Sequence, residues 1–382
     1  MFNIRHPQKT WFGVGSVSKV VEEVNFLNGK HLLFFTDKGI SEAGIADIIL
    51  EQLNKESVEI TIHDTCPPEP AIQDLENIFD EYKNKKFDLV IGVGGGSTMD
   101  IAKSMSVLLT NTGNPRDFLG IDLVPEPGLP TILLPTTSGT GAEATPNAIF
   151  SIPEDQVKLA IVSTHLIPKV AVVDPELTIT APPKVTSAAG VDALTHCLET
   201  YVARNATILS EVYSLEGMKL ISRSLRKVCK DGSDIEARSD MALGSYYGGV
   251  ALAGAGAGAI HALAYPLGSR FHIPHGISNS LMFSHVMKIN YSSEIKKFAK
   301  IANILDEDTL SLNEEKAAEH SVDAVKKLCE DCGVPTRLSE VDVPAHAIPE
   351  LAESAFKLER LLNCNPKKLT LEEIEKIYQS AT

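Results

Sequence analysis

The sequence predicts two domains, an α/β domain with a mostly parallel sheet followed by an all-helical domain. A chain of 382 residues exceeds the usual size of a single hydrophobic core. In the first half, segments typical of strands alternate with segments typical of helices, which is the pattern of a doubly wound parallel sheet. After 181–190 the strand patterns almost vanish, so we place the boundary near residue 180, between domains 1–180 and 181–382.

Short apolar runs predict the strands of the first domain, and amphipathic stretches predict its helices. Most of the runs are continuously apolar, as in strands that a parallel sheet buries on both faces. The expected order is strand 31–37, helix 41–55, strand 58–64, helix 71–86, strand 87–95, helix 98–109, and strands 131–137 and 169–175.

Long amphipathic patterns predict only helices in the second domain, at 190–204, 208–229, 234–268, 280–304, 314–332, 346–362 and 370–380. Residues 246–268 are long enough to cross a bilayer. However, the segment is dominated by Gly and Ala and contains His261, so a closely packed helix inside a protein is the better interpretation.

The composition excludes several classes of partner. The chain is 43% apolar and 22% charged, with a net charge of -15 and a pI near 5.2. Such acidity argues against nucleic acid or an anionic membrane as the main partner and leaves a small-molecule substrate. Residues 1–15 lack the apolar core of a signal peptide, and the six cysteines form no disulfide framework, so we expect a cytoplasmic protein. Cys329 and Cys332 form a C-x-x-C pair, which we interpret as a helix end rather than a metal or redox site.

A glycine-rich turn follows the strand predicted at 87–95 and opens the next helix. Gly94, Gly95 and Gly96 let the backbone approach a pyrophosphate, and Ser97 can cap the helix and donate to phosphate. The strand–turn–helix setting favours phosphate binding, although a tight turn without a ligand is the alternative.

Two further segments are candidates for the same site. The stretch 136–144 is rich in hydroxyls and glycine and follows a predicted strand, so it can line a cofactor or form a capped loop. Asp37 ends the strand predicted at 31–37, where an acid typically accepts hydrogen bonds from a ribose diol and repels a 2′-phosphate. That role favours NAD over NADP, and a helix cap is the equal alternative.

Four potential metal ligands lie in two glycine-rich stretches. Asp192 and His196 are four residues apart, so on a helix they project from one face, and His261 and His275 are fourteen apart. Each residue alone has an ordinary structural explanation, with His275 expected in a loop. Together they provide a carboxylate and three imidazoles with an open position for substrate. Such a site suits Lewis-acid catalysis of hydride transfer between an alcohol and a nicotinamide, with Fe²⁺ or Zn²⁺, since imidazole binds both.

These motifs resemble the iron-containing (group III) alcohol dehydrogenase family. The segments are GGGSTMDIAK (94–103), PTTSGTGAEAT (135–145), VDPELT (173–178), GVDALTHCLETY (190–201), HALAYPLGSRFHIPHG (261–276) and NPKKLTLEEIEKIY (365–378). In this order and spacing they extend the likeness over essentially the whole chain.

The resemblance implies a Rossmann-like dinucleotide-binding domain, a helical domain, and a cleft between them for NAD(P) and metal. It also implies an alcohol dehydrogenase activity, which with the preference expected from Asp37 would depend on NAD, and homodimers are common among such proteins. The implied iron ligands are Asp192, His196, His261 and His275. The implied cofactor contacts are Asp37, Gly95, Gly96, Ser97, Thr136, Thr137, Asn147 and Lys158.

The chain departs from the family pattern at two positions. Many members carry a histidine four residues after the third ligand, where it is thought to assist proton transfer, but here that residue is Tyr265. A phenol with a reference pKa near 10 is poorly suited to this task at neutral pH, and His272 is a candidate substitute. Glu69 stands where relatives often carry Asn, and near the adenosine ribose it would further disfavour NADP.

Other functions stay open. Arg270 and His272 are either solvated or face the substrate, in which case they would favour an anionic tail such as a hydroxy acid or sulfonate. Dehydroquinate synthase-like lyases share this architecture and use NAD with a divalent metal, but they need several basic residues around a phosphorylated substrate. A nucleotide-binding protein with a degenerate site is the non-enzymatic alternative, and the full ligand set argues against it.

Overall fold

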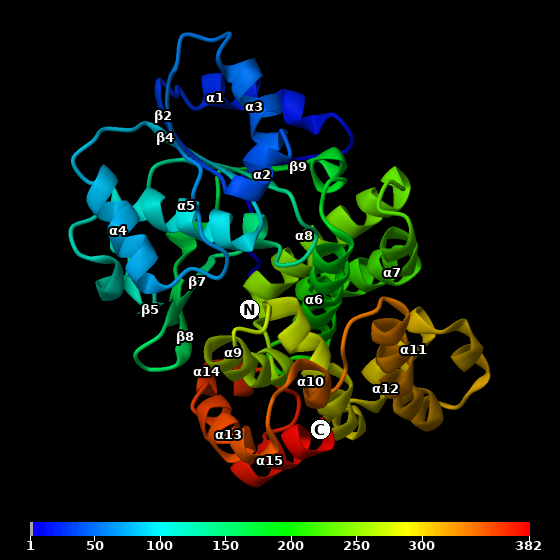
Figure 1. The fold of residues 1–382 in the computed structure, drawn as a ribbon. Coiled ribbons are helices and arrows are strands. Elements are labelled where there is room, and N and C mark those ends of the chain that lie inside the picture. Colours follow the sequence, from blue (N-terminus) through cyan, green and yellow to red (C-terminus); the bar gives the residue numbers. More distant parts are fainter. Residues whose placement is uncertain (1–2) are drawn as a thin grey trace. The chain divides into compact units, whose positions relative to one another are not determined.

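The computed structural model describes residues 3–382 and divides into two compact units (Figure 1). The first unit is Arg5–Ala181, and the second consists mainly of Pro182–Thr382. Each unit has its own hydrophobic core, with the core of the first unit split into two layers by a sheet.

A six-stranded parallel sheet forms the centre of the first unit, in the order β1–β9–β6–β4–β2–β3. Its strands are β1 (Lys9–Phe12), β2 (His31–Phe35), β3 (Glu59–His63), β4 (Leu89–Gly94), β6 (Thr131–Pro135) and β9 (Val170–Val173). The predicted parallel sheet is therefore confirmed. The edge strand β1 was not expected, because it is short and its side chains are only partly buried.

Helices cover both faces of this sheet because successive strand residues point to opposite sides. Leu32 and Phe34 of β2 pack on one face with α1 (Val20–Phe26) and α3 (Ile45–Leu53). Leu33 and Phe35 pack on the other face with α4 (Ile72–Tyr82) and α5 (Gly96–Leu108) (Figure 1). The inner strands β2, β4, β6 and β9 are buried on both faces, which explains their largely apolar sequences.

The first unit differs from the prediction in two places. The helix expected at 41–55 is divided into α2 (Lys38–Glu42) and α3 by Gly44, which adopts a left-handed conformation with φ of 73°. A small second sheet was missed, with β5 (Gly120–Ile121) beside the antiparallel pair β7 (Asn147–Ile152) and β8 (Val157–Val162). The sequence did carry a signal for β7, since every second residue, Ala148, Phe150 and Ile152, is apolar, and these are the residues that the structure buries.

Among its described residues the second unit contains helices and no strands, as predicted. Its helices are α6 (Pro183–Val202), α7 (Ile208–Lys230), α8 (Ile235–Ala255), α9 (Ala259–Phe271), α10 (His275–Asn290), α11 (Ile295–Leu305), α12 (Glu314–Asp331), α13 (Ile348–Phe356), α14 (Glu359–Leu362) and α15 (Leu371–Ser380). Helix α12 ends at Asp331 and is followed by Gly333 at φ of 68°, so the C-x-x-C pair lies at a helix end.

Three predicted helices are broken, and the pattern 346–362 divides into α13 and α14. The pattern 280–304 divides into α10 and α11. The pattern 234–268 divides into α8 and α9, which meet at an angle of 106° after Gly256 adopts a positive φ of 76°. Among the described residues, neither α8 nor α9 alone has the length and apolarity of a membrane span, and only the bent pair together meets that criterion.

Candidate functional site

The predicted nucleotide residues lie at the carboxyl ends of three neighbouring strands of the first unit. Asp37 follows β2, the glycine turn follows β4, and Thr136 follows β6, and these strands are adjacent in the sheet. The chain continues from β2 to β3 on one side, whereas β4 lies on the other side of β2. This reversal is the position at which open parallel sheets bind ligands.

The glycine turn is compact and faces the second predicted segment. A Cβ on Gly96 would lie 2.7 Å from Cγ2 of Thr140, and a Cβ on Gly95 would lie 3.5 Å from Oγ1 of Thr137. The two turns therefore contact each other, so 136–144 lies at the same position as the glycine turn. Helix α5 begins in the glycine turn, so its first backbone N–H groups lie there, and such groups have no partner inside the helix.

Ser97 does not cap helix α5, so that part of the prediction is wrong. The N-cap is Gly95, which provides no side-chain hydrogen bond, and Ser97 lies in the first turn. The Ser97 hydroxyl instead accepts a hydrogen bond of 2.9 Å from the backbone N–H of Glu69. Because the hydroxyl is an acceptor in this bond, its own proton is available to donate to a ligand.

Glu69 pairs with Lys158 across 2.6 Å, with the lysine side chain only 7% exposed. This ion pair joins the start of β8 to the loop before α4. It also alters the interpretation of Glu69, because a carboxylate neutralised by an ammonium repels a nearby 2′-phosphate less than a free one.

Asp37 caps helix α2, which was one of its two predicted roles. Its Oδ1 accepts from the backbone N–H of Ile40 at 3.1 Å, and its Oδ2 lies 3.4 Å from the hydroxyl of Thr98 in the first turn of α5. The carboxylate therefore lies next to the helix that carries the glycine turn. A cap that uses one oxygen leaves the other oriented towards this helix.

Buried Lys103 anchors the segment that leads into β7. Its Nζ lies 2.9 Å from Oδ1 of Asp100 and donates to the carbonyl of Ala142 at 3.0 Å and to the carbonyl of Asn147. The second Asp100 oxygen accepts from the backbone N–H of Ile149 at 2.9 Å. Asn147 is thus held beside α5 by its backbone, which sequence patterns gave no means to anticipate.

In the second unit, α6 presents Asp192 and His196 on one face, one turn apart. Helix α10 brings His275 to them because its start approaches α6 very closely. A Cβ on Gly276 would lie 2.2 Å from the backbone oxygen of Ala188, so only glycine permits this approach. His275 is the first residue of α10, after Pro274 as N-cap, and not part of a loop as predicted.

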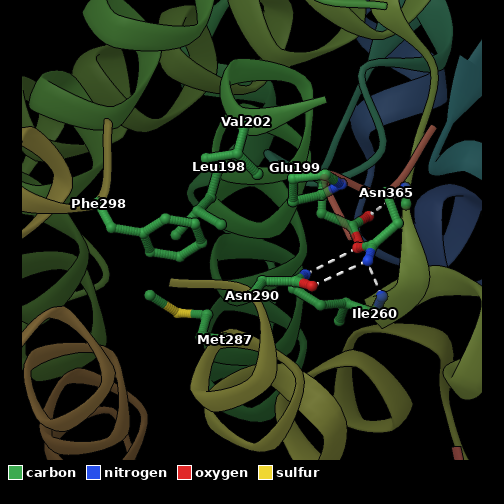
Figure 2. Close-up of a pocket in the computed structure, with 10 residues that line it drawn as sticks. Leu198, Glu199, Val202, Ile260, Met287, Asn290, Phe298 and Asn365 are labelled. Atoms are coloured by element: carbon green, nitrogen blue, oxygen red, sulfur yellow. Dashed lines mark hydrogen bonds between the residues drawn. The ribbon is translucent and has the colours of Figure 1, made fainter. Parts of the chain in front are cut away.

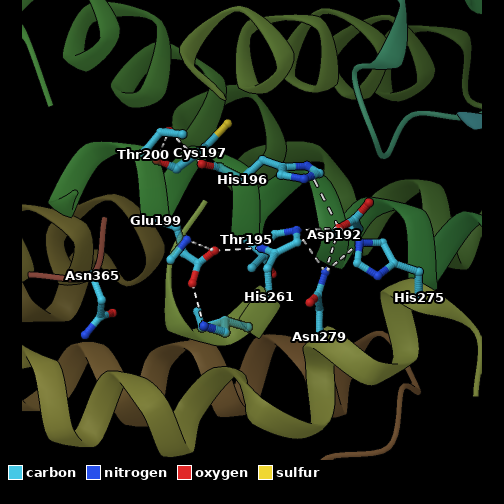
Figure 3. Close-up of polar contacts among 12 residues, drawn as sticks. Asp192, Thr195, His196, Cys197, Glu199, Thr200, His261, His275, Asn279 and Asn365 are labelled. Atoms are coloured by element: carbon cyan, nitrogen blue, oxygen red, sulfur yellow. Dashed lines mark hydrogen bonds and ion pairs between the residues drawn. The ribbon is translucent and has the colours of Figure 1, made fainter. Parts of the chain in front are cut away.

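Asp192, His261 and His275 form a compact group whose potential ligand atoms all lie within 4.8 Å of one another (Figure 3). Oδ1 of Asp192 is 3.6 Å from Nε2 of His261 and 3.5 Å from Nε2 of His275. Donor atoms about 2.1 Å from a shared tetrahedral metal are about 3.4 Å apart, so this spacing fits one ion. His196 lies beside the group, with Nδ1 at 3.9 Å from the same oxygen and its ring stacked on that of His261 at 4.6 Å.

The electrostatics of the group favour a cation. Burial would raise the pKa of Asp192, but His196, His275 and His261 outweigh it and hold the pKa of this carboxyl below its ordinary value. Burial would lower the pKa of His261, but Glu199 and Asp192 outweigh it and raise the pKa to about 9. Positive charge is thus stabilised between these side chains.

Asn279 supports the fit of this group to a metal and was not anticipated from sequence. Its Nδ2 donates to Oδ1 of Asp192 at 2.7 Å and lies 3.3 Å and 3.4 Å from the Nε2 atoms of His261 and His275. Its Oδ1 is buried without a protein partner, which is unfavourable unless another group satisfies it. The group itself provides a carboxylate and two imidazoles, which are donors that suit a divalent transition metal.

Access to the group is from the side of His275, whose side chain is 25% exposed, whereas Asp192 is 3% and His261 2% exposed. Tyr265 borders this side, with its ring centroid 5.8 Å from that of His275 and 6.4 Å from that of His261. The tyrosine is therefore near the group, as its position one turn after His261 predicts.

The structure does not bring His272 to the ligand group. His272 is exposed and ends α9 in a left-handed conformation with φ of 55°. Arg270 forms an ion pair with Glu350. An anionic substrate tail would therefore have to displace Glu350 in order to use Arg270.

Comparison with known proteins identifies relatives along the whole chain. Residues 7–175 match the family described as iron-containing alcohol dehydrogenase, and residues 186–382 match the Fe-containing alcohol dehydrogenase family, C-terminal. The sequence is 39% identical over 378 residues to long-chain-alcohol dehydrogenase 1 of Geobacillus thermodenitrificans, which covers 98% of this chain and 95% of that protein. It is 32% identical over 381 residues to the NAD-dependent methanol dehydrogenase of Bacillus methanolicus, with 100% of both covered. The crystal structure of 1,3-propanediol oxidoreductase matches with a TM-score of 0.96 at 33% identity over 100% of both chains.

Proposed function

Because the chain belongs to the iron-containing alcohol dehydrogenase family and is therefore an alcohol dehydrogenase-type oxidoreductase, we propose that it transfers a hydride between NAD(H) and a small alcohol or aldehyde. The observation that carries this proposal is the buried group of Asp192, His261 and His275, which is open on the side of Tyr265. The relative from Bacillus methanolicus, whose name states NAD dependence, supports the choice of cofactor.

The proposed NAD site lies in the first unit. The pyrophosphate would be held by the N–H groups at the start of α5 and by the Ser97 hydroxyl, because a helix N-terminus attracts anions. Asp37 would accept from the adenosine ribose. The full proposed set is Asp37, Glu69, Gly94, Gly95, Gly96, Ser97, Thr136, Thr137, Asn147 and Lys158.

The proposed metal site lies in the second unit. Asp192, His196, His261 and His275 would hold Fe²⁺, with Zn²⁺ as an alternative that the same donors accept. A bound divalent metal supplies Lewis-acid chemistry at the oxygen of the alcohol or aldehyde. The protein side chains orient the substrate and limit the access of water, since three of these residues are buried and Tyr265 adjoins His275.

We also propose that the protein works in the cytoplasm as a homodimer. The motif resemblance supports the dimer, because homodimers are common among such proteins. The low number of cysteines and the absence of a pattern for disulfide pairing support a reducing compartment.

Metal analysis together with a substrate panel tests the proposal. The purified protein should contain about one divalent metal per chain and should reduce NAD⁺ with at least some short primary alcohols or diols. Release of phosphate from a phosphorylated sugar acid, without NADH accumulation, would instead favour the dehydroquinate synthase-like alternative. Bound nucleotide with neither metal nor turnover would favour a non-enzymatic binding protein.

Tyr265→Phe should keep most of the turnover, because we expect Tyr265 to shape the pocket and hold a water or substrate oxygen through its hydroxyl. Proton transfer would then run through solvent or the cofactor ribose. Tyr265→His should shift the pH profile of the rate towards neutral, since imidazole titrates near neutral pH. The rate of each variant is measured against pH. A loss of about a thousandfold in Tyr265→Phe, within the range of a general acid–base residue, would identify the tyrosine as the proton relay.

A further inference from the structure

Glu199 lies on the same face of α6 as the first two proposed ligands. It follows Asp192 by seven residues and His196 by three, so the three side chains form one stripe along the helix. The Glu199 side chain is 4% exposed and therefore needs partners for its charge. Its partners all lie at the start of α9.

The Glu199 carboxylate accepts three short hydrogen bonds from this segment. Oε2 accepts from the backbone N–H of Gly258 at 2.9 Å and from Nδ1 of His261 at 2.6 Å. Oε1 accepts from the backbone N–H of Ile260 at 2.6 Å. The bonds to Gly258 and Ile260 satisfy N–H groups at the beginning of α9, which have no partner within the helix.

The bond to His261 determines which ring nitrogen is available to a metal. An ionised carboxylate only accepts hydrogen bonds, so the imidazole must place its proton on Nδ1. In the neutral ring that a metal would bind, Nε2 then carries the lone pair, and Nε2 lies 3.6 Å from Oδ1 of Asp192 (Figure 3). Glu199 and Asp192 are thus on opposite sides of the same ring.

We infer that Glu199 is a positioning residue for the metal site, which sets the tautomer and the orientation of His261. The inference rests on the proposed function only in taking His261 as a metal ligand. In carboxylate–histidine–metal arrangements of this kind, removal of the carboxylate typically lowers the metal affinity by about 10- to 100-fold.

The surroundings of Glu199 keep its carboxylate for these partners. Glu199 also borders a cavity of about 10 Å³, which is room for about one water molecule (Figure 2). The amides of Asn290 and Asn365 in its wall bind each other reciprocally at 2.7 Å and 2.8 Å. Two amides that satisfy each other do not compete for the carboxylate.

Glu199→Gln tests the inference, because the amide preserves the size of the side chain and removes its charge. Zn²⁺ affinity of the full-length protein is measured by competition with a chelator. We expect Glu199→Gln to bind Zn²⁺ about 10- to 100-fold more weakly than the parent. In ¹⁵N-histidine-labelled, Zn²⁺-loaded protein, the Nδ1–H resonance of His261 should shift or exchange faster in the variant. If Glu199 were only a helix clamp, which holds the start of α9 through Gly258 and Ile260, this resonance would not change in a variant whose circular dichroism equals that of the parent.

Glu23→Gln is the matched control, since Glu23 is another buried carboxylate that binds Trp11 and Lys9 in the first unit. Its Zn²⁺ affinity should equal that of the parent. If Glu199→Gln also keeps the parent's affinity, even with a lower unfolding temperature, Glu199 is only a helix clamp and the inference is wrong. A loss of affinity in Glu23→Gln equal to that in Glu199→Gln would overturn it as well. A parent that binds Zn²⁺ but transfers no hydride contradicts the proposed function alone, whereas a parent that binds no metal contradicts the ligand set itself.

Discussion

His261→Ala and His275→Ala are each expected to lose the bound metal and essentially all turnover while keeping the fold. Each substitution removes one of four proposed ligands, and the remaining donors hold a divalent ion much less firmly. The chemistry depends on the charge of the ion, so activity should fall with metal content. Elemental analysis of the purified variants, together with NAD⁺ reduction, measures both effects.

The two variants differ in what they leave behind, which makes them useful controls for each other. His261 is buried and bonded to Glu199, so its removal leaves a buried carboxylate with one partner fewer, at a cost to stability of about 1–3 kcal/mol. His275 is partly exposed, and its removal should change stability less. Circular dichroism and thermal unfolding check the fold. Stoichiometric metal with near-normal activity in either variant would show that the ligand set is wrong.

A preference for NAD(H) over NADP(H) is the second large effect that we expect, and Asp37 is its main cause. A 2′-phosphate beside a carboxylate is repelled by roughly 1–3 kcal/mol on the scale of partly screened charges. That range corresponds to about one to two orders of magnitude in kcat/KM. Asp37→Gly should narrow the gap, as measured by the ratio of kcat/KM for the two cofactors.

Glycine is the appropriate substitution because Asp37 also caps α2. Replacing such a cap by glycine costs only a few tenths of a kcal/mol, so the change in cofactor ratio can be separated from loss of structure. Glu69→Gln is the comparison, since Lys158 already neutralises Glu69 and the cofactor ratio should change less. Equal efficiency with both cofactors in the parent would contradict the proposed role of Asp37.

The elements that the sequence predicted well are those whose environment is uniform along the segment. Strands β2, β4 and β6 are buried on both faces, so their apolar runs are long enough to recognise. The metal residues were recognised because the i, i+4 spacing of Asp192 and His196 requires only a helix. Short or half-buried elements such as β1 and β7 gave a weaker pattern.

The details that were missed depend on contacts between segments far apart in the chain. The Gly/Ala-rich sequence pattern continues without interruption through the break between α8 and α9. The break occurs where Glu199 binds the N–H groups of Gly258 and Ile260, which are 59 and 61 residues away in the chain. Ser97 resembles a helix cap in sequence, but the helix begins two residues earlier than that cap predicts, and the hydroxyl binds Glu69, 28 residues away.

The sequence by itself therefore determined the architecture, the glycine turn and the candidate ligands, because periodicity and local spacing record which face of an element is buried. Only the tertiary structure decided how those ligands are oriented. The proton of His261 is directed by Glu199, and Asn279 contacts Asp192, His261 and His275 together from α10. Hydrogen bonds between distant segments are short-range and directional, and they are specified by the folded backbone, which no local pattern of residues describes.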